Sequence, residues 1–191
     1  MIIGITGKAN AGKDTIADYL VKNYGYKRIS LAEPIKRLVK DVFALDDYTV
    51  YDREAREKEL EKWPGWSVRK LLQFIGTELF RKNIDDAIWV KSLLYKIKKS
   101  ENEFGYNDYT CSDIRFPNEL SYLKNHTEPG EFFCIKVVRP GKNGDVGIKG
   151  HESEAYDLQG DFEIINDGNF EYLYNKVEKI IGEINENRNG R

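Results

Sequence analysis

A glycine-framed run near the amino terminus carries the clearest chemistry in the chain. Gly7–Thr15 reads GKANAGKDT, follows a short apolar segment and places Lys13 directly after Gly12. In a strand–loop–helix setting, the backbone N–H groups of such a loop and the positive end of the following helix converge on one small volume. That volume suits the β-phosphate of a nucleotide, with the lysine ammonium bridging the β- and γ-phosphates. The run therefore predicts phosphate binding; the alternative is a glycine turn with a surface lysine.

The residue after this lysine departs from the common phosphate-loop pattern. Asp14 stands where a Ser or Thr hydroxyl usually reaches magnesium, and a hydroxyl follows at Thr15. Either residue could serve the metal: a carboxylate holds Mg²⁺ through water, which would leave the hydroxyl for the α-phosphate. The residues of this loop that we expect to bind the nucleotide are Gly7, Lys8, Asn10, Ala11, Gly12, Lys13, Asp14 and Thr15.

A row of polar residues recurs at every fourth position of a predicted helix over residues 67–81. The row comprises Arg69, Gln73, Thr77 and Arg81, and the apolar stripe of the same helix comprises Val68, Leu71, Leu72, Ile75 and Leu79. Positions four apart drift by only about 40° around an α-helix, so the row forms one ridge. Arginine forks suit a phosphate and a planar amide suits a base edge, so this ridge could bind a nucleotide. The alternative is an ordinary solvated helix face.

Two charged residues follow a strand predicted at residues 109–112. Asp113 and Arg115 would lie at the carboxyl edge of the sheet, where ligands bind in open α/β folds. Asp113 could orient the water shell of magnesium, ligate it, or contact the acceptor sugar, and Arg115 could neutralise phosphate charge. Glu119 either joins the acceptor site or pairs with Arg115 and fixes its side chain.

Three further residues have either a binding or a structural role. Lys36, one turn into a predicted helix, is either an acceptor-phosphate contact or a surface lysine. Trp89 either stacks on a base or packs in the core. Arg139 opens a glycine-rich segment, 139–152, which also holds Lys142 and Lys149. Cations on a closing segment suit phosphoryl transfer, so this lid is predicted to place Arg139 over the transferring group; the alternative is an inert loop.

Composition narrows the class of partner. The 191 residues carry 30 basic and 32 acidic side chains, so no excess of positive charge draws the chain to nucleic acid or to an anionic membrane. No apolar run approaches the length needed to cross a bilayer. The two cysteines and two histidines make no zinc-ligand set. We expect a cytoplasmic chain with small-molecule partners; its oligomeric state is open, a homodimer being one option.

The predicted elements alternate between strands and helices. Apolar strand candidates lie at 1–6, 26–31, 109–112, 132–138 and 162–165, and helices are expected after the loop, from Pro34, over 67–81 and 85–99, from Pro117 and after Asn169. The helix from Pro34 has the apolar stripe Ile35, Leu38, Val39, Val42 and Phe43, and the last helix has Phe170, Leu173, Tyr174, Val177, Ile180, Ile181 and Ile184. This alternation predicts a five-stranded parallel sheet with helices on both faces.

The domain prediction is a single domain over residues 1–191. Within it we expect a charged surface insertion at 46–66, partly helical and of undetermined shape, a helical acceptor-binding region at 67–100, and the lid at 139–152.

The phosphate loop also carries a family resemblance. Residues 7–18, GKANAGKDTIAD, resemble the loop of the phage-type deoxynucleoside monophosphate kinases, within the P-loop nucleotide kinases. Further blocks resemble that family in the same order: LAEPIK at 31–36, LQFIGTE at 72–78 with Arg81, WV at 89–90, DIRFPNE at 113–119, HESE at 151–154 and NDG at 166–168. The order of the blocks carries the resemblance, which spans nearly the whole chain.

The resemblance implies a reaction and further site residues. It implies transfer of the ATP γ-phosphoryl group, with Mg²⁺, to a deoxynucleoside monophosphate. It places acceptor recognition near Asp113 and Arg115, and the turn from Asn166 to Gly168 under adenine, with its backbone reading the base edge. A phosphate acceptor needs no deprotonation near neutral pH, so His151 is not expected to act as a base. The alternatives are a kinase of another phosphorylated acceptor, of the dephospho-coenzyme A or phosphomevalonate type, and a nucleotide-binding regulatory switch.

Overall fold

The computed structural model describes residues 1–105, 107–141 and 156–189. Whereas the sequence predicts one domain, the contacts divide the chain into two compact units, one formed by residues 1–30 with 94–191 and one by residues 31–93. Within the described ranges, no helix is both long enough and apolar enough to span a membrane.

The first unit is built on a parallel sheet of five strands. The strands are β1 (Ile2–Thr6), β2 (Lys27–Ile29), β5 (Tyr109–Cys111), β6 (Phe132–Val138) and β7 (Phe162–Ile165), in the order β2-β5-β1-β6-β7. Every residue of β1 is buried, as expected for the central strand of a sheet covered on both faces. The predicted fold class is confirmed.

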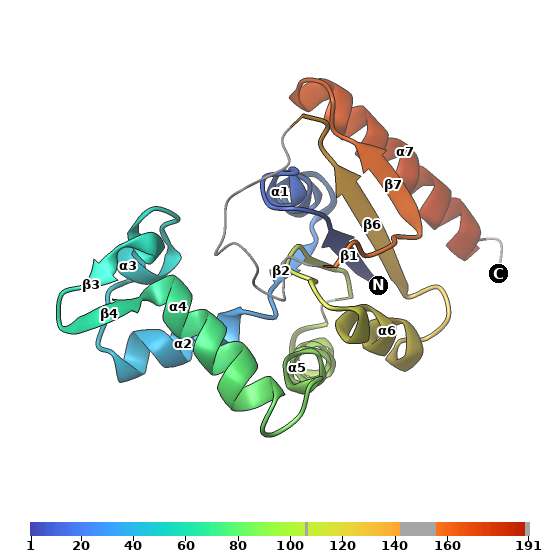
Figure 1. The fold of residues 1–191 in the computed structure, drawn as a ribbon. Coiled ribbons are helices and arrows are strands. Elements are labelled where there is room, and N and C mark those ends of the chain that lie inside the picture. Colours follow the sequence, from blue (N-terminus) through green and yellow to red (C-terminus); the bar gives the residue numbers. More distant parts are fainter. Residues whose placement is uncertain (106, 142–155, 190–191) are drawn as a thin grey trace. The chain divides into compact units, whose positions relative to one another are not determined.

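Alternation along β1 assigns the two faces of the sheet. Ile3 and Ile5 join the core cluster under α1 (Lys13–Tyr24) and α7 (Phe170–Asn189). The helix α1 contacts β1, β2 and β5, and Figure 1 shows α7 beside β7. Gly4 points to the opposite face, where a Cβ would lie 2.5 Å from Ile114 Cδ1. On that face α6 (Pro117–His126) packs against β6. The helix α5 (Ile88–Phe104) contains the passage from the second unit to the first.

The boundaries of the two outer helices follow their capping residues. Gly25 ends α1 in the left-handed conformation at φ 72°, as the sequence predicts. The Asn169 side chain accepts a hydrogen bond from the Tyr172 N–H at 2.9 Å and so caps α7, also as predicted. Phe170, however, is exposed rather than part of the buried stripe, because it occupies the first position of the helix, before the stripe reaches the sheet.

The second unit contains helices and one short hairpin. Its elements are α2 (Glu33–Val42), α3 (Asp47–Tyr51), the 3₁₀ turn η1 (Ala55–Glu57), β3 (Glu59–Leu60), β4 (Trp63–Ser67), α4 (Val68–Gln73) and the π-helix η2 (Phe74–Arg81). The charged insertion is partly helical as expected, but β3 and β4 pair as an antiparallel hairpin that the sequence did not predict. Val50, Ala55 and Leu60 are buried, so this segment is not exposed along its whole length.

Two predicted apolar stripes of this unit differ from the structure. Leu79 is 45% exposed, because the change from α- to π-helical winding after Gln73 rotates the later residues away from the extrapolated stripe. Val42 is 66% exposed at the end of α2. It lines an open apolar cavity of about 450 Å³ together with Phe43 and Trp63, rather than a closed core.

Candidate functional site

The loop between β1 and α1 is held in a shape that needs glycine at its ends. Gly7 and Gly12 have φ of 137° and 108°, and Asn10 also lies at positive φ, 63°. A Cβ on Gly7 would stand 2.3 Å from the carbonyl oxygen of Val137. The loop therefore lies against β6 at a distance that only glycine permits.

The Lys13 side chain folds back over this loop. Its Nζ donates hydrogen bonds of 2.7 Å to the carbonyl oxygens of Gly7 and Lys8. The ammonium is thereby held at the mouth of the loop, next to the first turn of α1. This is the setting in which an anion would meet a cation and the positive end of a helix together.

Asn166, which follows β7, supports the loop from behind. Its buried Nδ2 donates to the carbonyl oxygen of Ala11 at 2.8 Å, and its backbone N–H donates to Val138 at 2.7 Å. The backbone N–H of Asn166 is therefore bonded within the sheet edge, and the expectation that the backbone of this turn reads adenine stays a prediction. Gly168, in the same turn, is exposed. The contact joins residues 155 positions apart, so no local signal in the sequence could reveal it.

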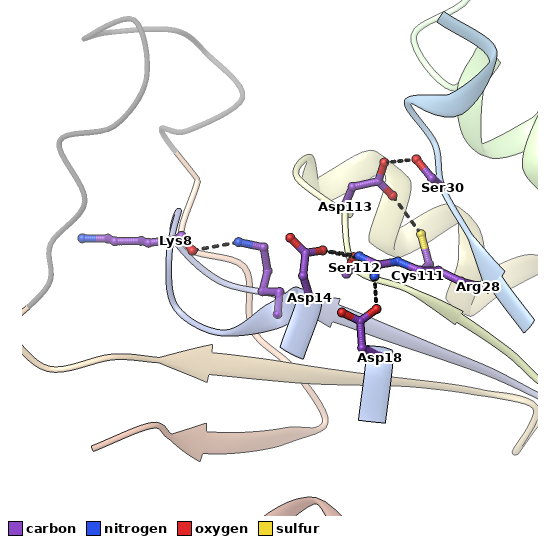
Figure 2. Close-up of polar contacts among 9 residues, drawn as sticks. Lys8, Asp14, Asp18, Arg28, Ser30, Cys111, Ser112 and Asp113 are labelled. Carbon is purple, nitrogen blue, oxygen red and sulfur yellow. Dashed lines mark hydrogen bonds and ion pairs between the residues drawn. The ribbon is translucent and has the colours of Figure 1, made fainter. Parts of the chain in front are cut away.

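Asp14 is held by two donors that sequence reasoning missed. Arg28 Nη2 and Ser112 Oγ both donate to its Oδ1, the latter at 2.7 Å, and Arg28 also pairs with Asp18 one turn further along α1 (Figure 2). Arg28 lies in β2 and Ser112 directly follows β5, its neighbour in the sheet. The available signal was the parallel pairing of these two strands, which places their carboxyl ends side by side.

Asp113 is also fixed by two neighbours. Ser30 Oγ donates to its Oδ2 at 2.7 Å, and the Cys111 thiol donates to its Oδ1 at 3.2 Å (Figure 2). Burial, together with the charge of Asp113, raises the pKa of Cys111 well above its usual value, so the thiol remains a proton donor. Ser30 was not expected in the site.

The donor set fits magnesium in the way nucleotide sites usually hold it. Among the described residues no three His, Cys, Asp or Glu side chains gather as a metal cage. Mg²⁺ in such sites commonly takes one or two carboxylates, several waters and the phosphate oxygens of the substrate. Asp14, Thr15 and Asp113 offer oxygen ligands of this kind around the loop.

The segment after Asp113 contains an exposed arginine and a buried carboxylate. Arg115 is exposed, whereas Glu119 is 4% exposed. Glu119 Oε2 accepts the backbone N–H groups of Arg115 and Phe116 at 2.9 and 3.1 Å. The Glu119 carboxylate therefore caps α6, which gives it a structural role; its place in the acceptor site stays a prediction. It also contacts Arg115, whose backbone N–H it accepts.

Of the three cations predicted on the lid, Arg139 lies within the described residues. It is partly buried and follows β6 directly, at the same sheet edge as the loop. Lys142, Lys149 and His151 lie outside the described residues.

The ridge predicted on residues 67–81 is only partly present in the second unit. Gln73 and Arg81 are partly exposed. Arg69 is paired with Glu57, and its side chain is 18% exposed. Thr77 is buried, because the π-helical turn brings it inward, so its expected place on the ridge is wrong.

Lys36 and Trp89 have clear surroundings within the same unit. The Lys36 ammonium lies 5.2 Å from the centre of the Tyr51 ring. Trp89 is 9% exposed, donates from Nε1 to the carbonyl oxygen of Gly76 at 3.0 Å and packs on Phe80. Of the two interpretations of Trp89, core packing is the one that its surroundings support, because its ring and its N–H both contact other parts of the protein.

The candidate site thus has one well-defined half. The ends of the five parallel strands bring together the phosphate loop, Ser30, Asp113, Arg139 and Asn166 in the first unit. Ligands in open α/β sheets bind at this edge, where the chain connections from the central strand diverge to the two sides. The candidates Lys36, Arg69, Gln73 and Arg81 belong to the second unit.

Comparisons with known proteins agree with this geometry. The family model described as deoxynucleotide monophosphate kinase matches residues 1–65 and 48–177. A candidate deoxynucleotide monophosphate kinase of Acanthamoeba polyphaga mimivirus is 30% identical over 196 residues, covering 93% of this chain and 94% of that protein. The deoxynucleotide monophosphate kinase of Enterobacteria phage T4 is 27% identical over 243 residues, covering 94% and 98%.

A solved structure supports the fold alone. The crystal structure of TT1252 from Thermus thermophilus superposes with a TM-score of 0.52 at 14% identity, covering 96% of this chain and 97% of that one. Since the family match extends from the phosphate loop to the last helix, the chain belongs to the deoxynucleotide monophosphate kinase family, as the order of its motifs implied.

Proposed function

We propose that the chain transfers the γ-phosphoryl group of ATP to a deoxynucleoside 5′-monophosphate, giving ADP and the deoxynucleoside diphosphate. The observation that carries the proposal is the loop from Gly7 to Lys13 at the carboxyl end of β1, where the Lys13 ammonium donates hydrogen bonds to two carbonyl oxygens of the loop. Family membership supports the deoxynucleotide as acceptor. We expect the reaction to take place in the cytoplasm, as the sequence predicts.

In this proposal the first unit binds the donor. Lys13 exchanges its bonds to the loop carbonyls for the β- and γ-phosphates, while the loop N–H groups hold the β-phosphate. Asn166 keeps the loop in shape through Ala11. When bound with ATP, Mg²⁺ would neutralise charge on the β- and γ-phosphate oxygens, with Asp14, Thr15 and Asp113 as the candidate ligands or holders of its water shell.

Transfer itself needs little covalent chemistry from the protein. An oxygen of the acceptor phosphate attacks the γ-phosphorus, and the bond to the oxygen bridging the β- and γ-phosphates breaks, leaving ADP. The acceptor phosphate is already an anion, so no base is required. Arg81 and Arg115 are the proposed acceptor-phosphate contacts, with Lys36 and Arg69 as further cations and Gln73 as the base contact. Arg139 is proposed to lie over the transferring group.

Lys13→Ala tests the donor assignment. We expect kcat to fall by about two to three orders of magnitude, because a charge over the transferring phosphates is lost, with an unchanged far-ultraviolet circular dichroism spectrum. Lys22→Ala, at an exposed lysine in the last turn of α1, should retain full activity. The measurement is ADP release in a coupled assay with ATP, Mg²⁺ and each deoxynucleoside monophosphate. Unchanged turnover in Lys13→Ala would remove the loop from the reaction.

The same assay separates the alternatives. Adding dephospho-coenzyme A and phosphomevalonate to the acceptor panel asks whether the second anion is a nucleotide at all. Turnover of one of these without any deoxynucleotide would replace the proposed acceptor. Tight nucleotide binding without transfer to any acceptor would favour a regulatory switch.

A further inference from the structure

Among the described residues, the hydrogen bonds that hold the carboxylate of Asp14 meet at one of its oxygens, Oδ1. Arg28 Nη2 and Ser112 Oγ both donate to Oδ1, and the same Arg28 nitrogen donates to Ser112 Oγ at 3.1 Å. The three side chains therefore close a small network around a single oxygen. Figure 2 shows the other carboxylate oxygen turned away from both donors.

The network is built by three elements of the first unit. Arg28 and Ser112 come from the paired strands β2 and β5, where Arg28 is in register with Thr110, two residues before Ser112. Asp14 lies in the first turn of α1. A second guanidinium nitrogen, Nη1, donates to Asp18. The arginine fork therefore spans two carboxylates one helical turn apart.

A carboxylate in this place differs from a hydroxyl in two ways that the protein must offset. It brings a negative charge close to where a triphosphate would lie, and it can rotate so that either oxygen, or neither, faces the ligand. A planar guanidinium addresses both, since it offsets the charge and directs a fixed fork at the carboxylate. Ser112 completes the hold on Oδ1.

We propose that Arg28 and Ser112 are positioning residues for Asp14, holding Oδ1 so that Oδ2 is presented to the hydrated Mg²⁺ of a nucleoside triphosphate. In this way the loop uses a carboxylate where a hydroxyl is usual. The inference rests on the proposed function, because it assumes a magnesium nucleotide in the loop. It adds two residues, from β2 and from the end of β5, that act on the metal only through Asp14.

The test measures metal binding separately from turnover. Mn²⁺, as a paramagnetic probe in place of Mg²⁺, is titrated by electron paramagnetic resonance into protein saturated with a non-hydrolysable ATP analogue. We expect Arg28→Ala to weaken Mn²⁺ binding by about ten-fold, as is common when a group orienting a metal ligand is lost. Arg28→Lys keeps the charge but not the fork and should fall between Arg28→Ala and the unaltered protein.

Two further variants separate positioning from support of the fold. Asp18→Asn removes the charge of the second carboxylate that Arg28 contacts and should leave Mn²⁺ affinity unchanged. In an Asp14→Asn background, Arg28→Ala should cause no additional loss, because its effect passes through that carboxylate. Melting temperatures accompany each titration; where Arg28→Ala does not fold, Ser112→Ala removes the second donor to Oδ1 and is expected to weaken Mn²⁺ binding in the same way.

Each outcome discriminates. Equal Mn²⁺ affinity in Arg28→Ala and the unaltered protein would overturn the inference while leaving the kinase proposal intact. An equal additional loss in the Asp14→Asn background would also overturn it, since Arg28 would then act directly. Failure of the unaltered protein to bind the analogue with Mn²⁺ would instead count against the proposed function itself.

Discussion

Arg69 and Arg81 show why residue type alone does not assign a binding role. Both belong to the ridge predicted on residues 67–81, but Arg69 is paired with Glu57 and largely covered. To bind a phosphate it would have to give up that ion pair. Arg81, in the last turn of η2, is the stronger acceptor candidate, and the family block that includes it points the same way.

Arg81→Ala should mainly weaken use of the acceptor. We expect kcat/KM for the deoxynucleotide to fall by about 10- to 100-fold, as loss of a hydrogen bond to a charged group implies, with the KM for ATP little changed. Arg37→Ala is the matched control, since this exposed arginine of the same unit pairs with Glu33. Steady-state kinetics with each substrate varied in turn make the measurement. Normal acceptor kinetics would remove Arg81 from the site.

At the residue scale, the predictions succeeded or failed according to how local their cause was. Lys13 is identifiable because spacing within one loop defines its surroundings. Arg28, Ser112 and the loop-supporting role of Asn166 depend on strands that meet only after folding. Trp89 could not be assigned from its type, because an amphipathic ring suits a ligand and a core equally well until its partners are known.

Among the elements, α6 depends on one buried carboxylate at its start. Glu119→Ala removes the acceptor for the N–H groups of Arg115 and Phe116. We expect the free energy of unfolding to drop by about 1–2 kcal/mol, which lowers the melting temperature by a few degrees. Glu119→Gln keeps an acceptor oxygen and should lie closer to the unaltered protein. Thermal denaturation provides the measurement. If Glu119→Ala weakened binding of the acceptor at unchanged stability, Glu119 would have a direct role in binding.

Helix and strand predictions failed where the winding or the length was unusual. The periodicity of residues 67–81 correctly predicts a helix, but the pattern assumes 3.6 residues per turn. The π-helix η2 changes that angle, which is why Thr77 is buried and Leu79 exposed. The hairpin escaped detection because β3 has only 2 residues and β4 contains Pro64 and Gly65, which are poor strand formers.

At the scale of the molecule, two capping carboxylates predict a response to acid. Hydrogen bonds from Thr49 lower the pKa of Asp46, and the N–H of Ala55 does the same for Asp52. A carboxylate with a lowered pKa stabilises the fold above its unfolded pKa of about 3.9, and this contribution disappears as the pH falls through the folded value.

Melting temperature should therefore decline as the pH is lowered from about 5 to about 3. A series of thermal melts across this range measures the effect. Asp46→Asn with Asp52→Asn, which keeps side-chain oxygens as caps but removes the titration, should flatten the decline. A slope identical to that of the unaltered protein would show that these two groups contribute nothing to it.

The fold class could be predicted because five apolar segments alternate with helical patterns, and burial of both sheet faces leaves a clear signal. Strand order and the division into two units could not, since both depend on which surfaces meet across long stretches of chain. For the same reason the sequence predicts the phosphate loop from one local segment, whereas the proposed acceptor contacts come from segments far apart in the chain.

The pairing of β2 with β5 has a consequence for how this chain could change its choice of substrate. The polypeptide leaves the sheet after Ile29 and rejoins it on the adjacent strand, with Ile29 and Cys111 in register. The unit of residues 31–93 is one continuous segment inserted in the chain between the strands β2 and β5. On the proposed function, exchanging that one stretch for a homologous stretch would replace the proposed acceptor contacts Lys36, Arg69, Gln73 and Arg81, and would leave the phosphate loop and Arg115 in place.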